Sequence, residues 1–492
     1  MKKWINGHFH TMRTKDDIYH TMVTDQGIIV GFDDAVSHIT PQETIDLHQC
    51  HVYPGFIDAH LHLIGYGRFI TLIDLRDVYT KEDVFLTLDK NKDKSMLYAE
   101  GYRDLGITKI ELDQLIPDKP VFLRHLDYHS LTLNSKALEL VKLSSDKGIL
   151  REEEAMTALK RLPKHKKDEL KMMLRHAIKQ LYAYGITGGD SDDLYYFNGF
   201  DETFSVFDEV LEEMPFRTHL LMHHETITDF VHSGKSWNEQ TPFLELGAVK
   251  MFYDGTMSSK TARMKDPYRG TNDHGEIVMG KQRFVDTLKR ARSLGLTAAI
   301  HVIGDQGLDD VAKLLKRFPP KPGQKDRIIH APWAMKKTIP LLKSLPITID
   351  IQPQFLSADL PRALDYFSKE PELIFPWKTY LEEDIPILGS SDAPVETPNP
   401  LLGMKDAIYR ESNHNHQAYH LEQSLPPFEA IKLYTTYAHQ QHTKTNRGYL
   451  DQGMIADFTV SSKDLLTLNK DEWNEPLIEM TIIDEQIVYQ KK

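Results

Sequence analysis

The sequence predicts an α/β fold in which a (β/α)8 barrel is joined to a small β domain built from both ends of the chain. The 492 residues are too many for one small domain and suit a barrel of about 250 residues with an accessory domain. Short apolar runs alternate with amphipathic helices through the middle of the chain, which is typical of βαβ units. Both ends are instead rich in short strands and turns, as expected of one domain that the termini share.

The β domain is expected to comprise residues 1–54 and 446–492. Asn6-Gly7 is a hairpin signal, because this pair favours the tight turn that joins two antiparallel strands. Further short strands are predicted at residues 27–31, 51–53, 456–460, 480–483 and 487–489.

The barrel is expected within residues 55–445. Eight short apolar runs qualify as its strands, and eight is the strand number of this fold. Helices such as those predicted at residues 284–294 and 308–318 lie between them. The candidate strands are residues 55–62, 185–190, 216–223, 248–254, 297–303, 327–331, 347–352 and 385–392.

Residues 66–175 interrupt this alternation, because such a connection after the first barrel strand far exceeds an ordinary βα loop. The segment contains a strand-like run at residues 120–124 and a polar cluster at residues 124–129. A basic helix at residues 161–179 is interpreted as a solvated face. Since βα loops emerge on the active-site face of a barrel, the insertion is predicted to form a subdomain over the barrel mouth.

Composition argues against several classes of partner and site. The formal net charge of −13 argues against nucleic acid or an anionic membrane as the main partner. Cys50 is the single cysteine, so neither an intrachain disulfide nor a zinc site built on two or more cysteines can form. The N-terminus turns polar too early for a signal peptide, and no apolar run reaches the length of a membrane span. We therefore expect a soluble cytoplasmic protein.

A His-x-His pair closes the first predicted barrel strand. Alternate residues of a strand point to the same face, so His60 and His62 project together and can converge on one metal ion. The alternative is a strand tip with two solvated histidines. Candidate ligands at the ends of later strands favour the metal.

Four later residues complete this set. Lys250 lies inside an otherwise apolar run, although lysine is seldom fully buried unless it is paired or reactive; the alternative is an edge residue whose amine reaches solvent. His301 and His330 each end an apolar run, where catalytic residues lie in such barrels. Asp392 follows the eighth strand, and we interpret it as a metal ligand and general base rather than a turn aspartate.

The predicted ligands are imidazoles and carboxylates, which suit a borderline divalent ion such as zinc. Such an ion lowers the pKa of bound water towards about 7. A carboxylate beside it can take the proton, while the ion or neighbouring donors polarise a scissile carbonyl. The sequence therefore predicts a metal-dependent hydrolytic site.

Several stretches resemble the metal-dependent amidohydrolase superfamily, and the resemblance covers essentially the whole chain. It rests on residues 54–62, on Lys250, His301 and His330, and on Ser391-Asp392. A finer similarity is to the YtcJ-like branch, which includes N-substituted formamide deformylases. The stretches similar to that branch are residues 127–129, 134–138, 249–255, 261–262, 267–268, 301–305, 352–353, 391–394 and 453–458.

The resemblance implies a distorted (β/α)8 barrel with a β-sandwich formed by both termini, and one or two divalent metal ions, with Zn²⁺ expected. The His-x-His pair and Asp392 would hold one ion, and His301 and His330 the second. Lys250 would bridge both after its amine has reacted with carbon dioxide to form a carbamate, and burial favours the neutral amine that this reaction needs. The alternative is a one-metal site in which Lys250 is unmodified.

Substrate contacts are expected from residues outside the ligand set. Tyr128 stands where the branch often has glycine, which would crowd the pocket. His129 is expected to orient substrate or to stabilise the oxyanion, as a substrate-binding and catalytic residue. Asp127, His224 and Asp254 are further substrate-binding candidates. The plainer alternatives are a surface position for His224 and an orienting role for Asp254.

These features favour a hydrolase that acts on carbon–nitrogen bonds other than peptide bonds in a small amide-like substrate, through a metal-activated hydroxide. One alternative is deamination of a ring or an amidine, which would release ammonia. Another is a non-catalytic, ligand-binding paralogue, which would hydrolyse nothing. A homodimer is the favoured assembly, because barrels of this class often pair.

Overall fold

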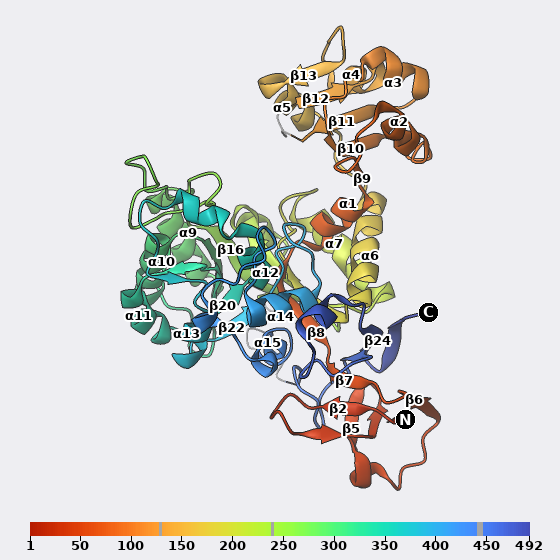
Figure 1. Ribbon diagram of the computed structural model, residues 1–492, viewed down its shortest axis with the longest axis vertical. Coiled ribbons are helices and arrows are strands. Elements are labelled where there is room, and N and C mark those ends of the chain that lie inside the picture. Colours follow the sequence, from red (N-terminus) through yellow and green to blue (C-terminus); the bar gives the residue numbers. More distant parts are fainter. Residues whose placement is uncertain (127–129, 238–240, 440–445) are drawn as a thin grey trace. The chain divides into compact units, whose positions relative to one another are not determined.

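The larger of two compact units in the chain contains a parallel β-barrel. A computed structural model describes residues 1–126, 130–237, 241–439 and 446–492 (Figure 1). Its largest sheet has the strand order β22-β20-β18-β17-β16-β15-β14-β8. All neighbouring strands in this sheet are parallel, so the eight predicted strands are confirmed with small shifts at their ends. They are β8 (Phe56–Leu61), β14 (Ile186–Ser191), β15 (Arg217–His223), β16 (Leu244–Phe252), β17 (Ala298–Val302), β18 (Asp326–His330), β20 (Ile347–Ile351) and β22 (Ile387–Gly389).

The two end strands of this sheet lie side by side and nearly close the barrel. The backbone N–H of Asp392, just after β22, donates to the carbonyl of His60 in β8 at 2.8 Å. The N–H of His62 donates to the carbonyl of Ala393 at 2.8 Å. The carboxyl ends of the first and last strands therefore meet, and the residues that follow them are brought together.

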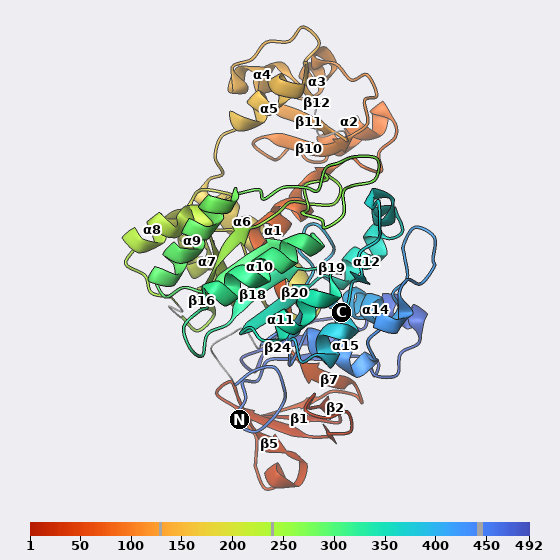
Figure 2. The ribbon, with the colours of Figure 1, turned by 90° about the vertical axis from the view of Figure 1, so that its left-hand side faces the viewer.

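Helices cover the outside of the barrel, as α9, α10 and α11 show (Figure 2). In α10, Leu308, Val311 and Leu315 are buried at the spacing that gives a helix one apolar face, and they pack into the barrel core. None of the helices in the described part of the chain combines the length and the apolar character needed to cross a membrane. The helices of this region are α1 (Leu63–Thr71), α6 (Lys167–Ala183), α7 (Phe200–Glu213), α8 (Ile227–His232), α9 (Lys281–Ser293), α10 (Asp305–Arg317), α11 (Ile339–Lys343), α12 (Pro353–Asp359), α13 (Trp377–Glu382), α14 (Pro400–Tyr409) and α15 (Pro427–Leu433), and two short strands, β19 (Trp333–Ala334) and β21 (Leu373–Ile374), pair beside them.

Two further sheets lie at the ends of the chain. N-terminal strands form one in the order β5-β4-β1-β6, and strands from both termini form the other in the order β25-β24-β23-β7-β2-β3. A shared apolar core that includes Trp4, Phe9 and Phe458 is fully buried, which explains why the two ends of the chain associate. The strands are β1 (Lys2–Ile5), β2 (His8–His10), β3 (Ile18–Tyr19), β4 (Met22–Asp25), β5 (Ile28–Phe32), β6 (Glu43–Asp46), β7 (His51–Pro54), β23 (Phe458–Ser461), β24 (Ile478–Ile483) and β25 (Gln486–Gln490).

The hairpin predicted at Asn6-Gly7 is wrong. Asn6 does adopt the left-handed conformation of a tight turn, with φ of 55°. However, β1 pairs with β4 and β6, whereas β2 pairs with β3 and β7. Trp4 of β1 and Phe9 of β2 are both buried in the core of the β domain. The two strands therefore lie in different sheets that share this core and do not pair with each other.

Residues Arg68–Lys166 form a separate compact unit with a five-stranded sheet in the order β13-β12-β11-β10-β9. The predicted strand at residues 120–124 is β11 in this sheet. The unit ends before the predicted 175, because the apolar face of α6 is buried in the barrel core. Its location over the barrel mouth stays a prediction. Its elements are β9 (Ile73–Asp74), α2 (Lys81–Asp89), β10 (Leu97–Tyr102), α3 (Lys109–Leu115), β11 (Val121–His125), β12 (Ser130–Leu133), α4 (Ser135–Val141), β13 (Ile149–Arg151) and α5 (Glu152–Lys160).

Candidate metal centre

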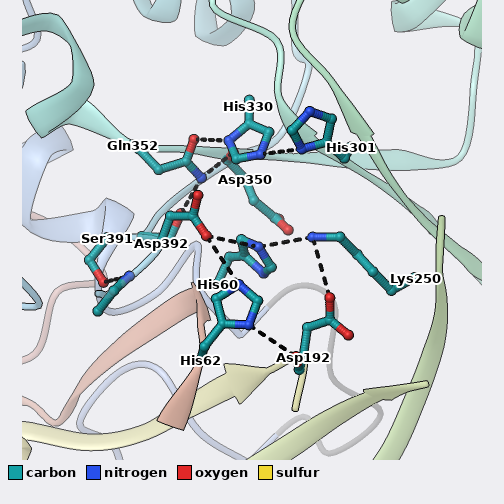
Figure 3. A network of polar contacts seen from close by, with 12 residues as sticks. His60, His62, Asp192, Lys250, His301, His330, Asp350, Gln352, Ser391 and Asp392 are labelled. Atoms are coloured by element: carbon teal, nitrogen blue, oxygen red, sulfur yellow. Dashed lines mark hydrogen bonds and ion pairs between the residues drawn. The ribbon is translucent and has the colours of Figure 1, made fainter. Parts of the chain in front are cut away.

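Two histidines and an aspartate face one another at the joined ends of β8 and β22 (Figure 3). Oδ1 of Asp392 lies 3.3 Å from Nε2 of His60 and 3.5 Å from Nε2 of His62. Ligand atoms from all three residues lie within 4.8 Å of one another. This spacing suits side chains that share one ion through bonds of about 2.0–2.2 Å.

Polar contacts hold these side chains in place. Asp58, on β8, accepts hydrogen bonds from the backbone N–H of Ser391 at 3.0 Å and from its hydroxyl at 2.5 Å, so it anchors the corner before Asp392. Nδ1 of His62 lies 3.0 Å from the carbonyl oxygen of Asp192. That contact assigns a proton to Nδ1 and leaves Nε2 to face Asp392.

Lys250 extends into the same site from strand β16 of the barrel wall. Its side chain is buried, with Nζ 3.0 Å from Nε2 of His60 and 3.8 Å from Oδ2 of Asp192. Burial lowers the pKa of Lys250, which favours the neutral amine. Lys250 is therefore not an edge residue with its amine in solvent.

His301 and His330 form a second pair of donors on the neighbouring strands β17 and β18. Nδ1 of His301 lies 3.0 Å from Nε2 of His330. Nδ1 of His330 lies 2.7 Å from Oε1 of Gln352, whose amide nitrogen donates to Oγ of Ser390 at 2.8 Å. Gln352 thus fixes the tautomer of His330. The ring centroids of His330 and His60 are 6.1 Å apart, so both groups of donors line one site.

Burial governs the protonation of these side chains. It holds the pKa values of His60 and His301 well below 6.5 and lowers the pKa of His330 to about 4. Burial would raise the pKa of Asp392, but hydrogen bonds with His60 and His62 outweigh it and hold this pKa well below the usual range. Burial also lowers the pKa of His62, yet Asp392 raises it to about 9, so a cation bound there would replace that proton.

The donor set fits a divalent cation. The three imidazoles with depressed pKa values are neutral at pH 7, which is the form that binds metal, and the carboxylate is ionised. Nδ1 of His60 is buried and has no hydrogen-bond partner in the described part of the chain. Nitrogen and oxygen donors of this kind are typical ligands of zinc and similar ions.

His224, one predicted substrate-binding residue, follows β15 beside the site. Its ring centroid lies 6.3 Å from that of Phe252, and its Nε2 lies 3.5 Å from Oε1 of Glu225. The side chain is mostly buried, at 8% exposure, so it is not a plain surface histidine. Its contact with substrate stays a prediction.

Asp254 holds the loops that follow β16 and β17. Its carboxylate is buried and accepts backbone N–H bonds of 2.8–2.9 Å from Arg263, Ile303 and Gly304. This bonding gives Asp254 a positioning role within the fold, and a direct contact with substrate stays a prediction. Asp127 and His129, the remaining substrate-binding candidates, lie outside the described residues.

Asp192 belongs to the site although sequence reasoning did not single it out. It directly follows β14 and is fully buried, and its Oδ2 accepts a hydrogen bond from Tyr196 at 3.4 Å besides facing Lys250. Its Oδ1 has no hydrogen-bond partner among the residues described. Its position at the carboxyl end of a predicted barrel strand was the signal that could have identified it.

Two partly exposed tyrosines stand beside the histidines. The ring of Tyr195 stacks on His223 with centroids 4.3 Å apart, and the ring of Tyr196 lies 5.7 Å from that of His62. Tyr195 and Tyr196 are 46% and 45% exposed, so this loop offers aromatic surface next to the donors. No pattern in the sequence distinguishes them from other surface tyrosines.

Comparisons with known proteins agree with this picture. The sequence profile of the amidohydrolase family matches residues 43–489. YtcJ of Bacillus subtilis (strain 168), named as an amidohydrolase, is 32% identical, with 99% of each chain covered. The N-substituted formamide deformylase of Arthrobacter pascens is 22% identical over 99% of this chain and 98% of its own. The resemblance inferred from the motifs is thereby confirmed.

The fold is also similar to that of a solved structure. An uncharacterized metal-dependent hydrolase from Pyrococcus horikoshii OT3 superposes with a TM-score of 0.82 at 24% identity, covering 96% of this chain and 99% of its own. At that identity the likeness concerns the fold, and it supports a barrel with additional sheets.

Proposed function

This chain belongs to the amidohydrolase family, and on that premise we propose that it hydrolyses a carbon–nitrogen bond, other than a peptide bond, in a small amide-like substrate. The observation that carries the proposal is the largely buried set of donors in which ligand atoms of His60, His62 and Asp392 lie within 4.8 Å of one another. These donors lie at the carboxyl ends of barrel strands, the location of active sites in this fold.

The donors divide into two groups. The His60–His62 pair and Asp392 would hold one divalent ion, and His301 and His330 would hold a second. Lys250 would bridge them as a carbamate, formed when its neutral amine adds carbon dioxide and releases a proton. Zinc is the ion we propose, because the donors are nitrogen and oxygen atoms. When bound, such an ion makes water more acidic and polarises a carbonyl group.

Asp392 is the proposed general base and acid. Its low pKa keeps the carboxylate ionised at neutral pH, ready to take a proton from the attacking water. The water oxygen bonds to the carbonyl carbon, the carbon–nitrogen bond breaks, and the same proton passes from Asp392 to the leaving nitrogen. The products are a carboxylic acid and an amine.

The substrate would lie between the donors and the aromatic side chains of Tyr195 and Tyr196. N-substituted formamides are the first class we would test, because the relative from Arthrobacter pascens is named for them. His224, Asp254, Asp127 and His129 are proposed to shape the substrate side. We also propose a cytoplasmic homodimer.

The test is the Asp392→Asn variant, assayed on a panel of N-substituted formamides and other small amides. Loss of proton transfer should lower the rate of amine release by about 10²–10⁴-fold, with the circular dichroism spectrum retained. Asp384→Asn, at a side chain that is 86% exposed, is the matched control and should keep the wild-type rate.

The products and the variant rates decide between the proposals. An unchanged rate in Asp392→Asn would remove that residue from the mechanism. Ammonia in place of an organic amine would favour deamination. A wild-type protein that contains no metal after metal-supplemented expression, and that hydrolyses no member of the panel, would favour a ligand-binding role.

A further inference from the structure

We propose that His10, His51 and Asp464 form a second divalent-metal site, located in the β domain and independent of the metal centre in the barrel. The site consists of the same side-chain types as the first group of donors there, two histidines and one aspartate. Its role would be structural, because it joins the first strands of the chain to a segment close to its C-terminus.

The donor atoms of this second site are already gathered. Nε2 of His10 lies 3.0 Å from Nδ1 of His51 and 3.8 Å from Oδ1 of Asp464. Ligand atoms from all three residues lie within 4.8 Å of one another, as do those of His60, His62 and Asp392. Bonds of about 2.0–2.2 Å from a single ion can therefore reach all three.

Strand pairing explains how the two histidines meet. β2 and β7 are parallel, with His8 opposite His51 and Phe9 opposite Val52. Phe9 and Val52 enter the core of the β domain. Because alternate residues of a strand face opposite sides, the side chains of His8, His10 and His51 lie together on the other face.

The carboxylate comes from the opposite end of the chain. β23 pairs with β7, and Asp464 follows β23 by three residues. Oδ1 of Asp464 accepts hydrogen bonds from the hydroxyl of Tyr53 at 2.7 Å and from the backbone N–H of Leu466 at 2.9 Å. These bonds hold the carboxylate in position beside His10.

The burial of His10 favours a bound cation over a simple hydrogen-bonded cluster. His10 is 2% exposed, and its Nδ1 has no hydrogen-bond partner among the described residues. Its Nε2 faces both Nδ1 of His51 and Oδ1 of Asp464, so a divalent ion at this point would contact two imidazoles and a carboxylate at once. Three protein ligands also leave a fourth position for water.

The test measures metal binding by the full-length protein. The His60→Gln/His62→Gln double variant removes the first donors of the barrel site and serves as the background. Each protein is stripped with a chelator, dialysed against micromolar Zn²⁺ and analysed by plasma mass spectrometry. We expect His10→Gln and Asp464→Asn, each added to the background, to lose about one Zn²⁺ per chain. Any ion held by His301 and His330 stays constant across the set.

His8→Gln is the matched control. The His8 ring stacks on His51 with centroids 4.7 Å apart, but it is not one of the three donors, so this variant should keep the zinc. A visible absorption band of bound Co²⁺ that disappears only in the donor variants would support the site. Equal zinc content in the background and in both donor variants, all folded by circular dichroism, would overturn it.

Discussion

Lys250 occupies an unusual environment for an amine, because its nitrogen is buried between an imidazole and a carboxylate. Nζ lies 3.0 Å from His60 and 3.8 Å from Asp192. A permanently charged lysine would repel any cation held by His60. The depressed pKa of Lys250 removes that repulsion and makes the amine nucleophilic, so the same burial serves both metal binding and carbamate formation.

Lys250→Ala should therefore change the metal content of the protein. If Lys250 bridges two ions as a carbamate, the variant should lose about one ion per chain, as measured by plasma mass spectrometry on freshly purified protein. Wild-type protein with one ion that the substitution leaves in place would indicate a mononuclear site and an unmodified lysine.

Gln352 should increase metal affinity indirectly, by orienting His330 and not by binding the ion itself. It accepts a hydrogen bond from Nδ1 of His330, and partners of this kind typically account for 10–100-fold in metal affinity, so we expect a loss of about that size in Gln352→Leu. Competition with a chromogenic chelator measures it. Gln282→Leu, at an exposed position, should bind like wild type. An unaltered affinity in Gln352→Leu would show that the hydrogen bond to His330 does not contribute to metal binding.

The elements of the barrel were predictable because each strand is a short apolar run bounded by turn residues, and its candidate ligands lie at the carboxyl end. The roles of the three aspartates in the run Asp190-Ser-Asp192-Asp193 could not be predicted in this way. Asp190 pairs with Arg327 inside the barrel, Asp192 faces Lys250, and Asp193 accepts a backbone N–H of α1. All three residues are aspartates, so their roles differ only because of where each lies relative to the end of β14 at Ser191.

The candidate site at the second His-x-His pair could not be predicted for a different reason. His8-Phe-His10 has the same pattern as His60-Leu-His62, but its candidate partners His51 and Asp464 become neighbours only through the pairing of β2 with β7 and of β7 with β23. The Asn6-Gly7 signal pointed to another pairing for β2. Long-range pairing depends on which side chains share a core, and local turn residues do not determine that.

Arg327 links three strands of the barrel. Its guanidinium donates to Asp190 at 2.6 Å, to Asp350 at 2.6 Å and to the carbonyl of Ala59. Arg327→Met would leave two buried carboxylates without their cation, so we expect a loss of about 3–5 kcal/mol in the free energy of unfolding, measured by denaturant titration.

The matched control for Arg327 is a surface ion pair. Arg283 lies 2.5 Å from Glu225, but its side chain is 58% exposed. Arg283→Met should change the free energy of unfolding by less than about 1 kcal/mol. Similar losses in both variants would show that the buried Arg327 network contributes no more than a solvated pair.

The loop after β22 should make stability depend on pH. Burial, with the charges of Asp359 and Asp406, raises the pKa of Glu396 from 4.5 to about 7. The folded chain then holds a proton that the unfolded chain releases, so this group lowers the free energy of unfolding as the pH rises from about 4.5 through about 7.

The Glu396→Gln variant should lose the contribution of this side chain to the pH dependence of the free energy of unfolding. At pH 8 the variant should be more stable than wild type by about 1 kcal/mol, after allowance for solvent screening, and near pH 4.5 the two should be equal. Denaturant titrations at both pH values measure the difference. A variant that is no more stable at pH 8 would contradict the raised pKa.

At the scale of the whole molecule, residues Arg68–Lys166 carry their own apolar cores. Leu97, Val121 and Leu123 are buried in one of them, and a unit of about 100 residues with its own core can fold alone. The isolated fragment of residues 68–166 should therefore unfold cooperatively when followed by circular dichroism.

Leu123→Ala tests that the fragment has the packing described here. Leu123 is fully buried, so its truncation should cost the fragment about 2–5 kcal/mol. If the fragment shows no cooperative unfolding transition, or if Leu123→Ala leaves its free energy of unfolding unchanged, the unit depends on the rest of the chain.

The β domain has a consequence for how a newly made chain matures. Tyr53 in β7 bonds to Asp464, 411 residues later, and β7 continues directly into β8, which carries His60. At about 5–20 residues per second, translation of that interval takes about 20–80 s. The strands at the N-terminus therefore lack their final partners until Asp464 has been made, and β7, which leads into β8, is not fully paired before then.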